Sequence, residues 1–192
     1  MTPAREMREL VRESYSAAAV HPEGRHPFPT GREFALALGY TEEWLAGVPS
    51  GSVEAFAGVS NLAVTAPIPP GATVLDLGCG AGLDALIAAR RARRVVALDF
   101  SPAMVGRAAA GVRSAGAGNV LVACGDAESL PLPDASVDLA LANGIFNLNP
   151  ARADIFRELA RVVRPGGAVF AAELVLVEPL LPPERTRDNW FA

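Results

Sequence analysis

The stretch Thr73-Val74-Leu75-Asp76-Leu77-Gly78-Cys79-Gly80-Ala81-Gly82 decides the fold of this chain. Its first half is a short, mostly apolar run, which is typical of a buried strand. Its second half places glycine at every second position, and glycine lets a backbone turn sharply and approach a ligand closely. Residues 83–91 then continue as a helix, so the stretch predicts a strand, a tight turn and a helix whose first amides face a bound anion or carboxylate.

The rest of the chain repeats this alternation of strand and helix. Ser101 caps a second helix that has Pro102 in its first position and runs to about residue 115. Further strands are predicted at 94–98, 119–123, 136–141 and 168–177, and a further helix at 151–163. Short apolar strands that alternate with helices indicate an α/β fold, a Rossmann-like parallel sheet with helices on both faces.

The sequence predicts a separate helical cap or lid at residues 1–70 and the sheet-containing core at residues 71–192. Pro3 is suited to the first turn of a long helix. Prolines exclude regular structure from the loop at 21–29. Hydroxyl side chains suited to helix caps begin three short helices, at Thr30, Thr41 and Ser52.

Composition excludes several classes of function. The net charge of -4 gives no basic face for nucleic acid. No apolar run approaches the roughly 20 residues that span a bilayer, so no membrane association is expected. The two cysteines are too few for a disulfide framework or a zinc cluster, and we predict no metal site. Residues 1–10 lack the apolar core of a signal peptide, which favours a cytoplasmic location.

Two acidic residues follow the second and third predicted strands. Asp99 lies 17 residues after Gly82, where a carboxylate can accept from both hydroxyls of a ribose. Asp126 can accept from the exocyclic amine of adenine. Apolar side chains that would flank a flat base are Phe100, Met104 and Ala127. A nicotinamide-dependent oxidoreductase is the alternative, but dinucleotide binders leave two residues before the third glycine, and this chain leaves one.

With these pieces in order, the chain resembles the class I S-adenosylmethionine-dependent methyltransferases. The matching segments are 74–82, 97–101, 125–128, 130–138 and 159–167. The resemblance implies a seven-stranded sheet and S-adenosylmethionine as cofactor. It places methionine and ribose at the glycine turn, the ribose on Asp99 and the adenine on Asp126. The predicted cofactor site is Asp76, Gly78, Cys79, Gly80, Gly82, Asp99, Phe100, Met104, Asp126, Ala127 and Asn143.

Within that family, the segments 38–43, 58–61, 82–84 and 142–150 are most similar to the arsenite methyltransferases. The resemblance implies arsenic-binding cysteines before Asn61 and after Asn143, but this chain has Val59 or Ser60 and Gly144 there. Soft thiophilic ions need thiolate ligands. We therefore predict a methyltransferase for a small molecule, with an arsenite methyltransferase or a non-catalytic cofactor-binding module as alternatives.

Candidates for positioning the methyl acceptor are Tyr15 and Asn147, and His21 and His26 are candidate lid residues. Asn143 and Asn147 could both position a substrate but neither is a base, and no catalytic residue is predicted. Past residue 177 prolines break the pattern, so the fifth strand is expected near an open sheet edge. We expect that C-terminal strands are missing from this chain or that a second copy covers the edge as a homo-oligomer.

Overall fold

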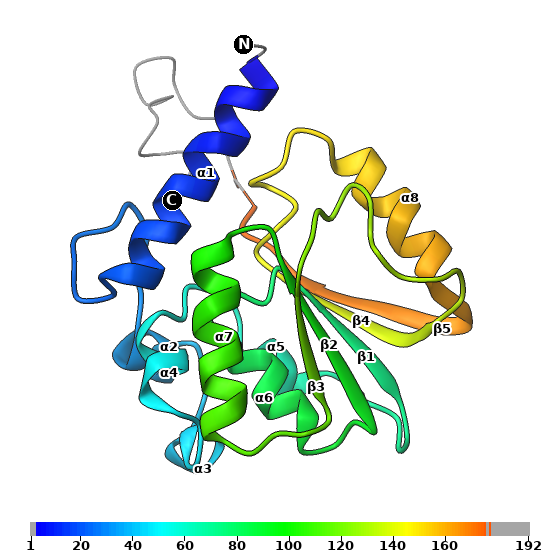
Figure 1. Ribbon diagram of the computed structural model, residues 1–192, viewed down its shortest axis with the longest axis horizontal. Helices are drawn as coiled ribbons and strands as arrows, with labels where there is room; N and C mark the ends of the chain where they lie inside the picture. Colours follow the sequence, from blue (N-terminus) through cyan, green and yellow to red (C-terminus); the bar gives the residue numbers. More distant parts are fainter. Residues whose placement is uncertain (1–2, 176, 178–192) are drawn as a thin grey trace.

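Five parallel strands form one sheet in the computed structural model, which describes residues 3–175 and 177 (Figure 1). Their order across the sheet is β3-β2-β1-β4-β5. The strands are β1 (Thr73–Leu77), β2 (Arg94–Asp99), β3 (Val120–Cys124), β4 (Val137–Asn143) and β5 (Val163–Ala172). The core helices are α6 (Leu83–Ala89), α7 (Pro102–Ser114) and α8 (Arg152–Val162). The chain order reverses direction between β1 and β4, and open parallel sheets bind ligands at such a point.

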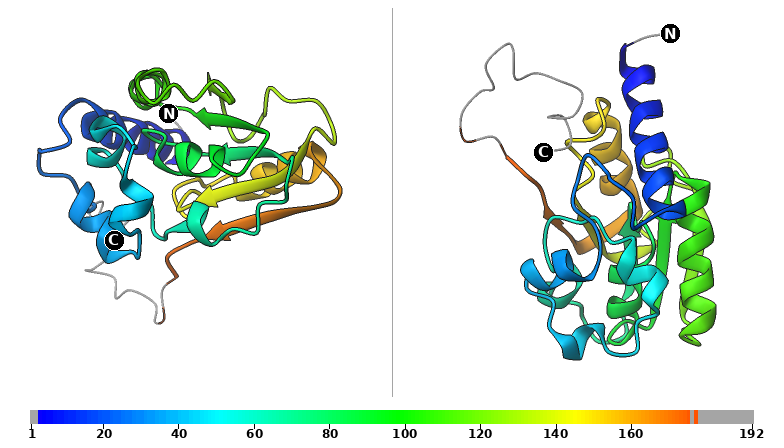
Figure 2. Two further views of the ribbon diagram at one scale, coloured as in Figure 1. Left: turned by 90° about the horizontal axis from the view of Figure 1, so that it is seen from below. Right: turned by 90° about the vertical axis from the view of Figure 1, so that its left-hand side faces the viewer.

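Side chains that alternate along the central strands face two different helical layers, which Figure 2 shows on opposite sides of the sheet. Val74 packs with Ile87 of α6, while its neighbour Leu75 packs with Leu159 of α8. All of β1 is buried, as expected of a central parallel strand covered on both faces. The predicted Rossmann-like sheet with helices on both faces is confirmed.

Most predicted core elements are confirmed to within about two residues, and the fifth strand is the exception. It was predicted at 168–177, but β5 begins at Val163 and ends at Ala172. Val163 already pairs with Val137, and a register irregularity precedes the pairing of Ala168 with Leu139. Pro165, Gly166 and Gly167, which precede the predicted strand, therefore lie within β5. The predicted break past residue 177 lies outside the described residues.

Of the four predicted helix caps, two are confirmed and two are wrong. Ser101 and Thr41 accept hydrogen bonds from the amides of Met104 and Trp44. Thr30 does not cap, because its hydroxyl donates to the carbonyl of Pro22, and α2 begins after Gly31. Ser52 lies inside α4, whose N-cap is Pro49.

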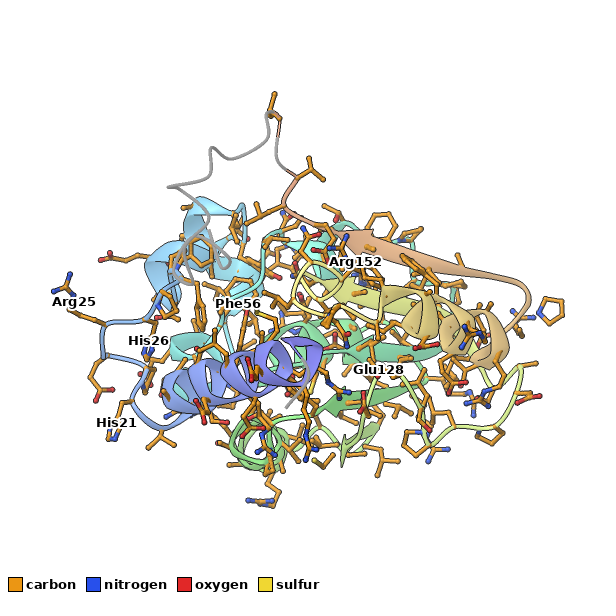
Figure 3. The ribbon with its side chains drawn as sticks, turned by 90° about the horizontal axis from the view of Figure 1, so that it is seen from above. His21, Arg25, His26, Phe56, Glu128 and Arg152 are labelled. Atoms are coloured by element: carbon orange, nitrogen blue, oxygen red, sulfur yellow. The ribbon has the colours of Figure 1, made fainter. Side chains whose placement is uncertain are left out.

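The N-terminal segment contributes one long helix and four short ones: α1 (Pro3–Val20), α2 (Arg32–Ala37), α3 (Glu42–Leu45), α4 (Ser50–Glu54) and α5 (Leu62–Thr65). Seen from above, α1 crosses the molecule, and its N-terminal half runs toward Glu128 (Figure 3). Among the described residues, no helix is long and apolar enough to cross a membrane.

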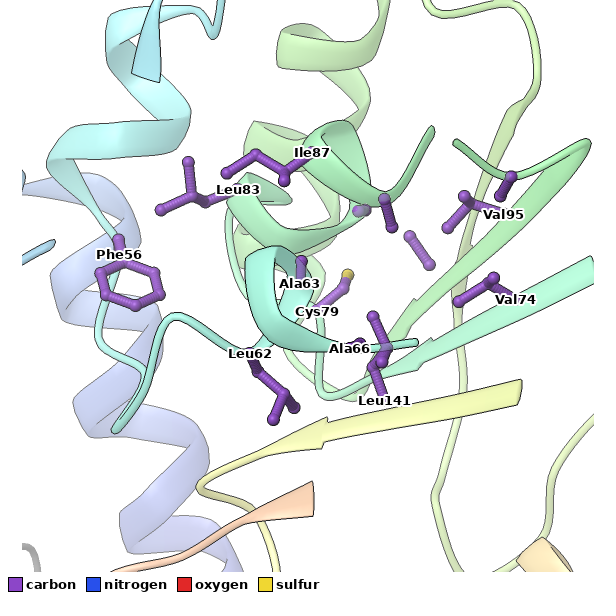
Figure 4. Packing of buried hydrophobic residues seen from close by; sticks show 14 of the residues in the cluster. Phe56, Leu62, Ala63, Ala66, Val74, Cys79, Leu83, Ile87, Val95 and Leu141 are labelled. Carbon is purple, nitrogen blue, oxygen red and sulfur yellow. The ribbon is translucent and has the colours of Figure 1, made fainter. Parts of the chain in front are cut away.

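One hydrophobic cluster joins the N-terminal segment to the sheet. Ala63 and Ala66, on and just after α5, pack with Val74 of β1 and with α6 (Figure 4). Phe56 belongs to the same cluster, and Tyr40 contacts its ring edge-on at 5.2 Å. The segment therefore shares a core with the sheet, which fixes its position beside the glycine turn.

Candidate functional site

The turn after β1 brings three glycines into the left-handed backbone region. The φ angles of Gly78, Gly80 and Gly82 are +72°, +52° and +87°. Residues other than glycine rarely adopt such φ angles. The turn is fixed to β2 because the amides of Gly78 and Cys79 both donate to the carbonyl of Leu98, at 2.8 and 3.0 Å. The glycines thus hold the backbone in a shape that opens a cavity at the carboxyl ends of the strands.

Asp99, the last residue of β2, is 7% exposed and holds this turn in place. Its Oδ2 accepts from the amide of Gly80 at 2.9 Å, and its Oδ1 accepts from the amide of Ser101 at 2.8 Å. Burial raises the pKa of this carboxyl, and the backbone donors oppose that shift. Since a carboxylate offers about four acceptor positions, each oxygen keeps a lone pair for a further donor.

Asp76 on β1 is a buried acid with an unused oxygen. It is 2% exposed, and its Oδ2 makes no hydrogen bond within the described part of the chain. Burial and the neighbouring carboxylates of Asp84 and Asp99 raise the pKa of Asp76 well above its usual range. A buried carboxylate oxygen without a hydrogen-bond donor is costly, so the site favours a ligand that brings positive charge or a donor.

The set of groups therefore suits the cofactor that the resemblance implies. S-adenosylmethionine carries an ammonium, a sulfonium and two ribose hydroxyls. Asp76 supplies an unpartnered acceptor for a cation, and Asp99 keeps acceptor positions for hydroxyl donors. The glycine turn supplies the close backbone approach. Asp76, Asp99 and Gly80 thus fit this group by their own chemistry.

The unpartnered acid makes stability depend on pH. In the unfolded chain Asp76 loses its proton near pH 4, whereas the folded chain retains it to higher pH. Between these values the folded state binds more protons, so its stability falls as the pH rises. We expect the Tm of the ligand-free protein to drop by roughly 5 °C between about pH 5 and about pH 8, and calorimetry at both pH values measures this.

Asp76→Asn keeps the shape and removes the charge, so it should flatten this pH profile. Asp134→Asn is the matched control, because Asp134 is an acid whose side chain is 78% exposed. If Asp76→Asn shows the same pH dependence of Tm as the wild type, Asp76 does not carry the buried proton.

Asp126 follows β3 and contacts the N-terminal helix. Arg8 of α1 donates to its Oδ2, and the same guanidinium lies 2.9 Å from Glu128 Oε1. The amide of Glu128 donates to Asp126 Oδ1 at 3.1 Å. The Asp126 side chain remains 40% exposed, at the edge of the cavity.

Asn143, at the end of β4, is fully engaged within the protein. Its Oδ1 accepts from the amides of Val59 and Ser60, at 2.9 and 3.1 Å. Its Nδ2 donates to Asp84 Oδ2 at 2.8 Å, and Asp84 Oδ1 accepts from the hydroxyl of Tyr40. Asn143 therefore positions the segment at 58–61 beside the cavity.

Glu173, just after β5, fixes the loop between β4 and α8. It accepts from the amides of Phe146 and Asn147, at 2.6 and 3.4 Å. This loop brings Ile145 over the glycine turn, so close that a side chain at Gly78 would collide with it.

A single cavity gathers most of the residues predicted from the sequence. Its wall includes Tyr15, Asp76, Gly78, Cys79, Gly80, Asp99, Phe100, Met104, Asp126, Ala127 and Asn143. Among the described residues, Gly82 and Asn147 are not part of that wall. Gly82 instead caps α6, and Asn147 Nδ2 donates to the carbonyl of Leu174.

Sequence reasoning missed other wall residues, including Arg8, Phe56, Asp84, Ile145 and Leu148. The Gly-Leu-Asp pattern around Asp84 was the one signal available for that acid. The two histidines lie elsewhere, and Figure 3 shows His21 and His26 near Arg25, away from Glu128. His26 Nε2 donates to the carbonyl of His21, so this loop interacts with itself.

The family model and two relatives that this chain matches are all methyltransferases. A family model described as a methyltransferase domain matches residues 74–167. An arsenite methyltransferase of Halobacterium salinarum is 32% identical over 191 residues, covering 91% of this chain and 49% of that protein. A 27-O-demethylrifamycin SV methyltransferase of Amycolatopsis mediterranei is 35% identical over 119 residues, covering 61% of this chain and 44% of that protein.

A solved structure supports the same grouping. The crystal structure of an arsenic (III) S-adenosylmethionine methyltransferase from Chlamydomonas reinhardtii matches with a TM-score of 0.64 at 31% identity. The match covers 76% of this chain and 52% of the other. The chain spans about half the length of the curated relatives it matches.

Proposed function

Because this chain belongs to the class I S-adenosylmethionine-dependent methyltransferases, whose cofactor is S-adenosylmethionine, we propose that it transfers a methyl group to a small organic molecule. The observation that carries the proposal is the cavity at the carboxyl ends of the strands, where Asp76 and Asp99 meet the glycine turn. The cofactor is a cation, and the wall offers buried carboxylates to receive it.

The residues of the wall divide into proposed roles. Asp99 accepts from the ribose hydroxyls, Asp126 from the adenine amine, and Asp76 from the ammonium. Phe100, Met104 and Ala127 flank the base, while Gly78, Cys79 and Gly80 approach the methionine part. Gly82 supports the turn from behind, and Asn143 acts by holding the segment at 58–61.

Much of the remaining wall is apolar, which supports an uncharged organic acceptor. Its apolar members include Val11, Ala55, Phe56, Ala57, Ile145 and Leu148. The polar side chains of Arg8, Asp84 and Asn149 also line the cavity, and each is paired within the protein. Two hydroxyls interrupt it, those of Tyr15 and Ser52, and Ser52 Oγ has no hydrogen-bond partner among the described residues. Such a wall binds the body of an apolar molecule and offers hydroxyls to one polar group.

The positions that correspond to arsenic-binding cysteines lie side by side, but they hold no thiol. Val59 Cγ1 lies 3.0 Å from where a Cβ on Gly144 would be. Cys79 is buried in the glycine turn, and burial raises the pKa of its thiol. Since arsenite binds thiolates, this wall supports an organic acceptor over arsenite.

The protein needs to supply few reactive groups, because the bound cofactor supplies an activated methyl group. The wall residues bind the two reactants, orient them and exclude water. Burial, with Asp99 and Glu173 nearby, raises the pKa of Tyr15. Its phenol therefore stays protonated at neutral pH, so Tyr15 positions the acceptor as a hydrogen-bond donor and does not act as a base. Asn147 remains a proposed positioning residue only if the loop after β4 moves.

Calorimetry of the full 192-residue chain with S-adenosylmethionine tests the first half of the proposal. We expect saturable binding, and no binding at about millimolar cofactor overturns it. Labelled cofactor is then supplied with a panel of uncharged phenols and alcohols, and with arsenite in a parallel reaction.

The transfer assay tests the second half. Label in an organic product supports the proposal. Label in methylated arsenic alone overturns the choice of acceptor. Binding without label in any product, with a cell metabolite extract included, overturns the transferase activity in favour of a cofactor-binding module.

A further inference from the structure

We infer that Arg8 is a positioning residue that latches α1 over the cofactor cavity and must release Asp126 before the cofactor enters. The inference rests on the proposed function, because it takes Asp126 as the acceptor for adenine. It assigns to Arg8 the control of how fast the cofactor enters and leaves.

The contacts of Arg8 connect three parts of the molecule. Its guanidinium pairs with Asp126 and, at 2.9 Å, with Glu128, both in the loop after β3. Glu128 Oε1 also accepts from Asn149 Nδ2 at 2.9 Å, which adds the loop after β4. One side chain of α1 thus ties that helix to two loops that border the cavity.

Burial anchors α1 from about Leu10 onward, because Leu10 and Tyr15 pack against a buried cluster that includes Val11. Val11, Ala18 and Ala19 are buried, Ser16 shares a hydrogen bond with Ser101, and Tyr15 stacks on Phe28 at 4.4 Å. In the described part of α1 before Leu10, Arg8 is the residue whose side chain forms hydrogen bonds and ion pairs with another element. Its release would free the first turns of α1 to move about the anchored part.

The cavity is partly open to solvent, and its volume is small for the ligand. It measures about 120 Å³, whereas pockets for small ligands hold roughly 300–1,000 Å³. Arg8, Val11 and Tyr15 of α1 form part of its wall. Movement of the first turns of α1 would enlarge it, because the side-chain hydrogen bonds and ion pairs that hold these turns to another element are those of Arg8.

The proposal gives Arg8 and the cofactor the same carboxylate as a partner. Asp126 Oδ1 accepts from the amide of Glu128 and Oδ2 accepts from Arg8, so an adenine amine would be a third donor to Asp126. When adenine takes Asp126, Arg8 keeps Glu128 as its partner, so α1 closes again over the bound cofactor. An ion pair that is partly exposed contributes little stability, which suits a contact that opens at each binding event.

Surface plasmon resonance on the full chain, with S-adenosylhomocysteine as the ligand, measures entry and exit. We expect Arg8→Ala to raise both the association and the dissociation rate about fivefold, the scale of a partly exposed ion pair. Glu128→Gln should raise the dissociation rate and leave the association rate unchanged. The matched control is Arg12→Ala, since Arg12 lies one turn further along α1 and pairs with Glu9 of the same helix.

Hydrogen exchange of the ligand-free protein is a second measurement that needs no cofactor. Amides at residues 5–10 should exchange faster in Arg8→Ala than in Arg12→Ala. The latch is overturned if Arg8→Ala and Arg12→Ala have equal association and dissociation rates and equal hydrogen exchange at residues 5–10. A wild-type chain that fails to bind S-adenosylhomocysteine overturns the proposed function instead, and the exchange result then still decides whether Arg8 holds α1.

Discussion

Replacing Asp99 with alanine is expected to lower the affinity for S-adenosylmethionine at least about 100-fold. The substitution removes the acceptor that fixes the amides of Gly80 and Ser101, and it removes the proposed acceptor for the ribose. Hydrogen bonds to a charged group contribute about 1.5–3 kcal/mol each, and about 1.4 kcal/mol is tenfold in affinity. Isothermal calorimetry of the purified variant measures the loss.

The matched control is Asp138→Asn, at the opposite end of the sheet. Asp138 Oδ2 also accepts a backbone hydrogen bond, from Thr73 at 2.6 Å, and Asp138 pairs with Arg164. This control should lose some stability and bind the cofactor as the wild type does. Equal affinities of Asp99→Ala and Asp138→Asn would show that Asp99 does not contact the ligand.

Features that depend on local sequence were predictable. β1 was predicted at its observed bounds, because an apolar run that short between turn residues has the length of a strand and is too short for a typical helix. Ser101 was predicted as a cap because Pro102 follows it, and both signals act within one turn. The fold class followed from the order of such elements, without any knowledge of tertiary contacts.

Features that depend on pairing with distant residues were not predictable. The start of β5 is set by the pairing of Val163 with Val137, and apolar patterning does not reveal a strand that begins at a polar turn. Ser52 has the chemistry of a cap, but Pro49 three residues earlier already begins the helix.

The candidate site shows the same division. Asp99 and Asp126 follow strands directly, so the parallel sheet brings them to one edge. Arg8 reaches Asp126 from 118 residues away, and Tyr40 reaches Asp84 from 44 residues away. Neither contact has a local signal, because each depends on how the N-terminal segment packs on the sheet.

The network around Asp84 carries the largest expected effect on stability. Asp84 accepts from the Tyr40 hydroxyl, from the Ala63 amide at 3.2 Å and from Asn143 at 2.8 Å. Asp84→Ala removes one acceptor from all three donors in a buried site, and it leaves Tyr40 and Asn143 with the carbonyl of Ser60 alone. We expect a loss of about 3–5 kcal/mol in the free energy of unfolding, or roughly 10 °C in Tm. Denaturant titration and calorimetry measure both.

Tyr40→Phe separates the network from the packing of the ring. It removes one donor and keeps the aromatic contact with Phe56, so about 1–2 kcal/mol should be lost. Asp154→Asn is the control, because Asp154 pairs with Arg157 at the surface, where ion pairs contribute little. If Asp84→Ala is no less stable than Asp154→Asn, the network does not hold α5 and the segment at 58–61 to the sheet. If it is less stable as expected, the same variant should also raise the KM for the acceptor, because Asn143 loses the partner that orients it.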